Sequence, residues 1–310
     1  MNDISAITQT KLFGLEKYIN EFINLDKEDK LPNKILLSGQ KGLGKSTLAY
    51  HIINYVLSKN EKFNYDIDKF EINKKNHSYI TTLNRSNPNI ILIDSLSEKK
   101  SADMSQIRSL IINLNKSNFN NKPRFILIDN VERLNINSIN ALLKTIEEPT
   151  VNTHFILVNS NKKILRTLES RFINFRISLT NKECSDISKK LIGINLDNLI
   201  NKDLINYYST PGNIYNLVKF SEINEYNLLN MDLKRFLEVI IEESHYKKDN
   251  IIKYQIFDYI EFYLRKMKLS FNSEINDKYN YFIKRIFFTK KFNLDEESLF
   301  IEFREEILNG

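Results

Sequence analysis

A phosphate-binding loop near the start of the chain constrains its fold more than any other feature. Residues 39–47 read GQKGLGKST, which fits the pattern G-x-x-x-x-G-K-[S/T] of nucleotide-binding P-loops. An apolar run at 35–37 precedes the loop and a helical pattern at 48–52 follows it, the context that the pattern requires. Three of the seven glycines of the chain lie in this loop, where they let backbone N–H groups turn toward phosphate oxygens. The sequence therefore predicts a nucleoside-triphosphate-binding fold.

Within the loop, the residue types indicate separate roles. Lys45 is placed to reach the β- and γ-phosphates of a nucleotide, and the Ser46 hydroxyl is placed to hold Mg²⁺. The backbone of the loop and the start of the following helix would supply the other phosphate contacts. We therefore predict that the loop binds nucleotide through Gly39, Gln40, Lys41, Gly42, Leu43, Gly44, Lys45, Ser46 and Thr47.

Two later apolar runs end on polar residues that extend the predicted site. Residues 125–128 (FILI) lead to Asp129, which could hold Mg²⁺ through water opposite Ser46, or could only cap its strand. Residues 155–158 (FILV) lead to Asn159, whose amide could orient a water near the γ-phosphate or could only begin a turn. We include both residues in the predicted nucleotide site, and we assign Ser46 and Asp129 to the metal.

The alternation of strands and helices changes near residue 180. Strands expected at 34–38, 90–93, 125–128, 155–158 and 173–177 alternate with helical patterns, which predicts a parallel sheet covered on both faces. From residue 181 onward only helical stripes recur, for example at 233–241, 256–264, 282–286 and 299–307. We therefore expect an α/β domain over residues 1–179, a small helical domain over 180–222 and an all-α domain over 223–310. The polar residues 60–87 are expected to be an insertion or a connecting region.

Bulk properties narrow the class further. The chain has no run of about 18 apolar residues and no apolar segment near its N-terminus, so neither a membrane span nor a secretory signal is expected. The single cysteine, Cys184, excludes a disulfide framework and a cysteine-based zinc site, and it fits a cytoplasmic protein. We expect Cys184 to be a small buried residue on a helix. The net charge of +6 permits contact with phosphate polymers without requiring it.

Three further segments resemble a known family. Residues 134–149 (LNINSINALLKTIEEP) are similar to the NALLKTLEEP signature of bacterial and eukaryotic sliding-clamp loaders. Ser170-Arg171-Phe172 resembles their Ser-Arg-Cys motif, and Phe13-Gly14 resembles the start of their ATPase module. The resemblance covers residues 11–219 and implies an AAA+ P-loop module, a helical lid and a helical collar for oligomerisation.

Departures from the ATP-hydrolysing clamp-loader subunits make the chain most similar to the delta-prime class of the bacterial clamp loader. The motor subunits carry Asp-Glu where this chain has Asp129-Asn130, and an amide cannot act as the base that polarises water. Their lid presents an arginine, whereas residues 209–213 (STPGN) contain none, and no long tail follows the collar. The four-cysteine zinc module of many bacterial relatives is also missing, so no zinc is expected.

The resemblance implies a stator-like subunit of the DNA polymerase III clamp loader, which places the sliding clamp on primed DNA. It implies ATP and Mg²⁺ as ligands, weak or absent hydrolysis by this chain, and motor and delta subunits as partners in a hetero-oligomeric ring. Arg171 would be an arginine finger that acts in trans on the ATP of a neighbouring subunit. Alternatively, Arg171 forms only a surface salt bridge and has no role in catalysis. Two other classes stay open: a self-sufficient AAA+ motor, and a structural interaction protein whose P-loop binds nothing.

Overall fold

The computed structural model describes residues 5–94, 102–114, 120–147, 152–206, 209–268 and 273–309, which form two compact units. One unit contains the residues up to Ile187 together with Thr210–Gly212. The other contains Ser188–Ser209 and Asn213–Gly310. The further division of the helical part into a lid and a collar stays a prediction.

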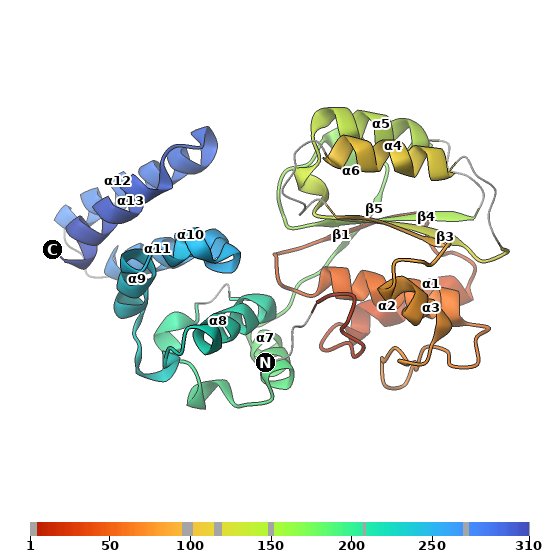
Figure 1. Cartoon of the computed structure of the whole chain (residues 1–310), viewed down its shortest axis with the longest axis horizontal. Helices are drawn as coiled ribbons and strands as arrows, with labels where there is room; N and C mark the ends of the chain where they lie inside the picture. Colours follow the sequence, from red (N-terminus) through yellow and green to blue (C-terminus); the bar gives the residue numbers. More distant parts are fainter. Residues whose placement is uncertain are drawn as a thin grey trace. The chain divides into compact units, whose positions relative to one another are not determined.

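The first unit is built on five parallel strands in the order β2-β3-β4-β1-β5. The strands are β1 Lys34–Ser38, β2 Ile90–Asp94, β3 Arg124–Asp129, β4 Thr153–Asn159 and β5 Ile173–Arg176. Helices α1 Glu16–Lys27, α2 Lys45–Ser58 and α3 His77–Leu83 lie on one face, while α4 Ala102–Leu114, α5 Ile136–Glu147 and α6 Arg166–Glu169 lie on the other (Figure 1). Because both faces are covered, the central strands are apolar along nearly their whole length. The predicted parallel sheet with helices on both faces is confirmed.

The register of the strands gathers the polar strand ends at one edge of the sheet. Ser38 at the end of β1 pairs with Asn159 at the end of β4, and Asp94 pairs with Asp129 across β2 and β3. At the opposite edge, Ile173 at the start of β5 pairs with Ile35 near the start of β1. Residues that immediately precede β5 therefore lie away from the phosphate-binding loop, which follows the other end of β1.

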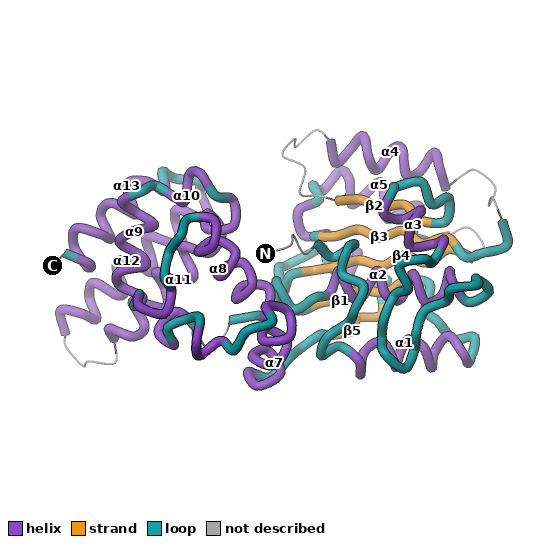
Figure 2. The backbone as a smooth tube through the Cα atoms, turned by 60° about the horizontal axis from the view of Figure 1, so that its bottom comes forward, coloured by secondary structure: helices purple, strands orange, loops and turns teal. Residues whose placement is uncertain are grey.

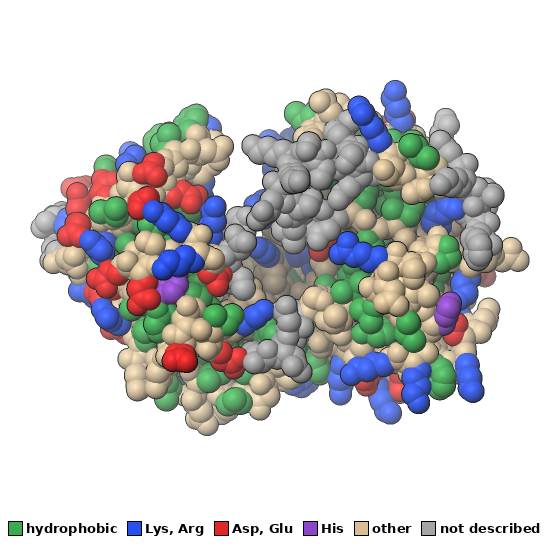
Figure 3. Space-filling model, in the orientation of Figure 1, with side chains coloured by type: hydrophobic (Ala, Val, Ile, Leu, Met, Phe, Trp, Pro, Cys, Tyr) green, Lys and Arg blue, Asp and Glu red, His purple; other side chains and the backbone are tan. Residues whose placement is uncertain are grey.

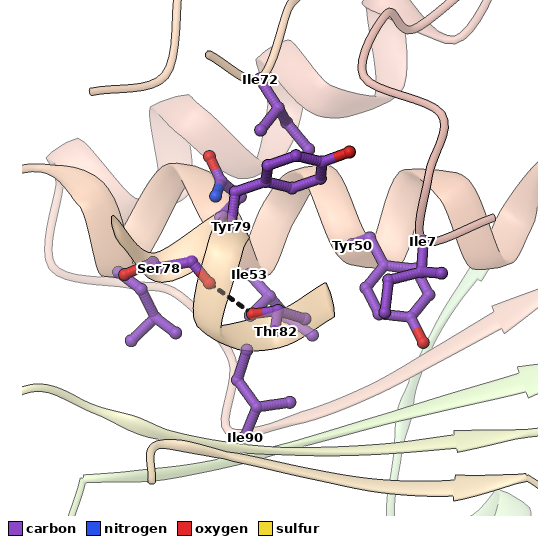
Figure 4. Close-up of a pocket in the computed structure, with 10 residues that line it drawn as sticks. Ile7, Tyr50, Ile53, Ile72, Ser78, Tyr79, Thr82 and Ile90 are labelled. Atoms are coloured by element: carbon purple, nitrogen blue, oxygen red, sulfur yellow. Dashed lines mark hydrogen bonds between the residues drawn. The ribbon is translucent and has the colours of Figure 1, made fainter. Parts of the chain in front are cut away.

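Residues 60–87 connect α2 to β2, as expected, and in addition contribute buried side chains to the core, which the sequence did not predict. Tyr65, Ile72 and Tyr79 are buried and pack with α1, α2 and the strands of the sheet. Figure 4 shows Tyr79 of α3 facing the same small cavity as Ile53 of α2 and Ile90 of β2. The sequence pattern missed this role because the buried residues are widely spaced among polar ones.

A buried histidine helps to hold this segment in place. The ring of His51 in α2 bonds through Nδ1 to the Tyr65 hydroxyl at 2.9 Å and through Nε2 to the Gln9 carbonyl at 3.1 Å. Burial lowers the pKa of His51 to about 4, so the ring is neutral at pH 7 and its Nε2–H donates to Gln9. The neutral ring thus links α2 to segments on either side of it in the sequence.

The second unit is helical, as expected (Figure 2). Its α-helices and those at its boundary are α7 Asn181–Ile192, α8 Pro211–Ile223, α9 Leu233–Glu242, α10 His245–Lys248, α11 Asn250–Lys268, α12 Ser273–Phe292 and α13 Glu296–Phe303. Short turns of 3-10 helix span Leu196–Asn198, Lys202–Leu204 and Leu228–Asn230, and a π-helical turn, Arg304–Leu308, follows α13. The stripes predicted on α9, α11, α12 and α13 meet in one apolar core.

Two details of the helical region bear on the sequence predictions. Pro211-Gly212, within the stretch 209–213 that lacks a lid arginine, forms the first turn of α8, a position that suits proline because its missing N–H needs no partner there. Cys184 is buried on α7 and is in no disulfide, which confirms its expected role. Throughout the described residues, no helix is both long and apolar enough to cross a membrane.

Candidate functional site

The phosphate-binding loop joins the end of β1 to the start of α2. Gly44, which immediately precedes α2, has a φ of 83°, and Gly42 has a φ of 86°. Both values lie in the left-handed region that residues with a side chain rarely adopt, so the loop needs glycine at these positions. Gln40 and Lys41 are exposed at the loop surface, while Leu43 is buried against the fold. The loop ends where the free N–H groups of the first turn of α2 begin, at Lys45, Ser46 and Thr47.

Lys45 is buried within this loop. The residue is only 4% exposed, and its Nζ donates to the carbonyl oxygen of Gln40 at 2.6 Å. Burial lowers its pKa to about 8, against the opposing influence of the carboxylates of Asp129 and Glu132. The ammonium group is therefore held inside the loop near two acids, where a phosphate could replace the carbonyl as its partner.

Ser46 and Asp129 meet at the carboxyl edge of the sheet. The Ser46 hydroxyl donates to Oδ2 of Asp129 at 2.8 Å, although the two residues are far apart in the sequence. The backbone N–H of Asn130 donates to the other oxygen, Oδ1, at 2.9 Å. The structure thus brings together the two residues that the sequence assigned to Mg²⁺, one from the first turn of α2 and the other from the end of β3.

The residue that follows Asp129 turns the chain instead of presenting an acid. Asn130 has a φ of 54°, in the left-handed region where asparagine is the most tolerated residue after glycine. The turn begins the short helix η1 Val131–Arg133, in which Val131 is fully buried. An amide at position 130 has no proton-accepting group suited to general base chemistry.

Glu132 is a charged group near the loop to which the sequence assigned no role. Its Oε2 atom is buried and has no hydrogen-bond partner, which is costly for a carboxylate. Its charge is close enough to act on Lys45. The only sequence signal for Glu132 was its position three residues after Asp129, and a pattern based on adjacent acids does not detect it.

These residues fit a nucleotide and its metal ion. The loop offers a buried ammonium and leads into the N-terminus of α2, where the N–H groups of the first turn can bind an anion. The unpartnered oxygen of Glu132 offers an acceptor for a metal-bound water. Within the described part of the chain, no group of three or more His, Cys, Asp or Glu residues could hold a metal by itself. Mg²⁺ at Ser46 and Asp129 would accordingly take its other ligands from phosphates and water, as it usually does.

Asn159 is committed to a local turn. Its Nδ2 donates to the Lys162 carbonyl at 2.9 Å, and its Oδ1 accepts from the Lys162 N–H at 3.2 Å. Asn159 lies at the same edge of the sheet as Ser38 through the β1–β4 pairing. The two bonds agree with the turn interpretation. They use one of the two Nδ2 hydrogens and one of the two Oδ1 lone pairs, so a contact with water near a phosphate stays a prediction.

Arg171 lies between α6 and β5, at the edge of the sheet opposite the phosphate-binding loop. Its guanidinium forms an ion pair with Glu147, the last residue of α5, and Nη1 donates to the Thr167 carbonyl at 2.5 Å. About a third of its side chain is exposed (33%). Arg171 is therefore placed at the surface, away from the Lys45 of its own chain. Glu148 and Pro149 of the same signature lie outside the described residues.

Comparison with known proteins places the chain in a family. A sequence profile described as "DNA polymerase III, delta subunit" matches residues 14–181, which is more than half of the chain. The chain belongs to this family. The match includes the phosphate-binding loop, Asp129 and Arg171, and it confirms the resemblance drawn from the sequence motifs.

Curated relatives of the chain are also DNA polymerase III subunits. The chain is 31% identical over 132 residues to DNA polymerase III subunit delta' of Buchnera aphidicola subsp. Baizongia pistaciae, which is 41% of this chain and 38% of the relative. It is 29% identical over 147 residues to subunit gamma/tau of Mycoplasma genitalium, covering 47% of this chain and 23% of the relative. The chain thus spans well under half the length of the relatives it matches.

Solved structures are less similar. A DNA polymerase III gamma subunit-related protein of Thermotoga maritima aligns with 91% of this chain and 96% of its own, at 16% identity and a TM-score of 0.49. The DNA clamp loader delta protein of Bacillus subtilis aligns with 94% of this chain and 100% of its own, at 12% identity and a TM-score of 0.33. Likeness at this level says nothing about the roles of individual residues.

Proposed function

We propose that this chain is a delta-prime-type subunit of the DNA polymerase III clamp loader. In this role it binds ATP with Mg²⁺, hydrolyses it poorly, and supports hydrolysis by a neighbouring subunit. One observation carries the proposal: the residues expected to bind nucleotide and metal are in place, but Asn130 stands where an acid should follow Asp129. The chain that holds this site belongs to the delta family. Binding without efficient turnover is what such a site supports.

Arg171 supplies the proposed action on the neighbour. It lies at the sheet edge opposite its own phosphate-binding loop, so it can serve only a nucleotide held by another chain. Its ion pair with Glu147 is partly exposed, and exposed pairs of this kind contribute little free energy. Breaking the ion pair with Glu147 would therefore cost little free energy. The guanidinium could then bind a phosphate of the nucleotide on a neighbouring subunit, as an arginine finger that acts in trans.

The helical unit offers a surface for the proposed assembly. On α12 and just after it, Phe287, Phe288, Phe292 and Leu294 are exposed, and the rings of Phe288 and Phe292 stack on each other. Exposed apolar groups gathered in this way mark protein contact sites more often than free surface. In Figure 3 acidic and basic side chains are mixed over the visible face of the helical unit, which supports protein rather than direct DNA contact there. The sliding clamp and primed DNA are accordingly proposed as partners through the complex, in the cytoplasm.

The second candidate is an ATP-hydrolysing motor subunit. The buried, unpartnered Oε2 of Glu132 favours it, because a carboxylate at that position could polarise water in place of the missing acid. The turn at Asn130 separates Glu132 from Asp129, and the stretch 209–213 contains no arginine to contact the third phosphate. We therefore favour the stator role.

Assembly with partner subunits tests the proposal. The tagged full-length chain, mixed with the gamma and delta subunits of DNA polymerase III from the same organism, is expected to elute with them as one complex of fixed composition. The double variant Phe288→Glu, Phe292→Glu should lose this complex, because it places carboxylates on the apolar contact face. Ile223→Glu, at a position on α8 that is at least as exposed, is the matched control and should retain it. Failure of the wild-type chain to join any complex at micromolar concentration contradicts the proposal.

A further inference from the structure

Two glycines that are far apart in the sequence touch backbone to backbone at the phosphate-binding loop. Gly42 is the middle glycine of the loop, and Gly212 lies in the first turn of α8. The N–H of Gly212 donates to the carbonyl oxygen of Gly42 at 2.9 Å. Both residues, with Thr210 and Pro211, belong to the same compact unit.

The hydrogen bond between Gly212 and Gly42 gives a partner to one polar backbone group of each residue. The N–H groups in the first turn of a helix have no partner within the helix, and the Gly42 carbonyl provides one for Gly212. On the loop side, the same bond ties down the Gly42 carbonyl, in a loop of the kind whose backbone N–H groups bind phosphate. The contact therefore fixes the loop in a form that can receive an anion.

The fit leaves no space for a side chain on either glycine. A Cβ atom on Gly212 would lie 2.7 Å from Cα of Gly42 and 3.0 Å from its carbonyl oxygen. A Cβ atom on Gly42 would lie 2.2 Å from Oγ1 of Thr210, which is itself 2% exposed. Backbone atoms on both sides of the contact cannot move aside as a flexible side chain can.

We propose that Thr210 and Gly212 are positioning residues of the nucleotide site, which hold the phosphate-binding loop in its receiving shape through Gly42. This inference rests on the proposed nucleotide binding and deepens it. The contact is made to the loop backbone, and residues 209–213 carry no cationic side chain that could distinguish a third phosphate. The residues therefore support ATP and ADP equally and do not sense the γ-phosphate.

Gly212→Ala tests the inference by inserting one methyl group into the contact. Gly212 is helical, where alanine is the better helix former, so the change does not strain the backbone of α8 itself. We expect the affinities for Mg²⁺-ATP and Mg²⁺-ADP to fall by the same factor, about ten or more in Kd. Calorimetry on the full chain measures both affinities. Thr210→Ala, which removes the group packed on Gly42, should lower both by about threefold, while Thr210→Ser stays close to wild type.

The control is Gly193→Ala, because a Cβ at Gly193 meets no atom within 4 Å. It should leave both affinities unchanged, although its left-handed φ of 79° lowers the melting temperature somewhat. Equal affinities for Gly212→Ala and wild type overturn the inference, as does a loss for ATP alone. If Gly212→Ala does not fold, unchanged affinities in Thr210→Ala overturn the inference on their own. If the wild-type chain binds no nucleotide, the proposed nucleotide binding fails instead.

Discussion

Lys45→Ala is expected to weaken binding of Mg²⁺-ATP to the isolated chain at least about a hundredfold, or about 3 kcal/mol. The substitution removes the buried ammonium that lies inside the loop on the Gln40 carbonyl. Calorimetric titration at pH 7 measures the change. Lys41→Ala is the matched control, since Lys41 belongs to the same loop but is exposed, and it should lose no more than a few-fold. Equal losses in the two variants contradict a specific role for Lys45.

The pH dependence of the same titration gives a second readout of Lys45. The pKa of Lys45 in the free protein is about 8, and phosphate binds the protonated form. Binding is therefore nearly independent of this group well below pH 8, the affinity is about halved at pH 8, and it falls above pH 8 by up to about tenfold per unit. The Lys45→Ala variant should lack this decline. A wild-type affinity that stays constant to pH 9.5 would show that the charge of Lys45 does not contribute.

Arg171→Ala is expected to lower ATP turnover at the neighbouring site of the reconstituted clamp loader by about 10³-fold, as for other arginine fingers. ATP binding to the isolated variant should equal that of wild type, because Arg171 lies at the far edge of the sheet from its own loop. Steady-state ATPase of the assembly, with clamp and primed DNA present, provides the measurement.

Two further variants make the Arg171 experiment specific. Arg171→Lys should not restore turnover, because an ammonium cannot reproduce the planar fork of donors. Arg166→Ala changes an exposed arginine on α6, in the same connection, and should behave as wild type. Full activity of the Arg171→Ala assembly would mean that this arginine is only half of a surface ion pair with Glu147.

The parts of the fold that depend on local sequence were predictable. The apolar runs that became β1 to β5, the loop glycines and the polar strand ends are all local patterns, and parallel pairing brings such ends together. That rule places Ser46 and Asp129 at the same end of the sheet, and the strand order, with only β4 between β1 and β3, brings them within hydrogen-bond distance. The exposed residues Phe287, Phe288 and Phe292 of α12 could not be separated from its buried residues Phe282 and Ile286 in the sequence, since both sets are large apolar residues.

Other features depend on contacts that no local pattern contains. The role of Tyr65, Ile72 and Tyr79 in the core emerges only when α2 and β2 are beside them. The left-handed turn at Asn130 determines where Glu132 lies, and one dihedral angle is not readable from the residue types around it. The contact of Gly42 with Gly212 joins two turns that each look ordinary alone.

The most direct test of the stator role is the ATP turnover of the isolated chain at saturating Mg²⁺-ATP, measured beside its ATP affinity. The site described above predicts measurable binding that depends on Lys45, with turnover far below that of a gamma subunit assayed in the same way. Turnover at the rate of the gamma subunit that Lys45→Ala abolishes would contradict the stator role, and its loss in Glu132→Gln would identify Glu132 as the acid responsible.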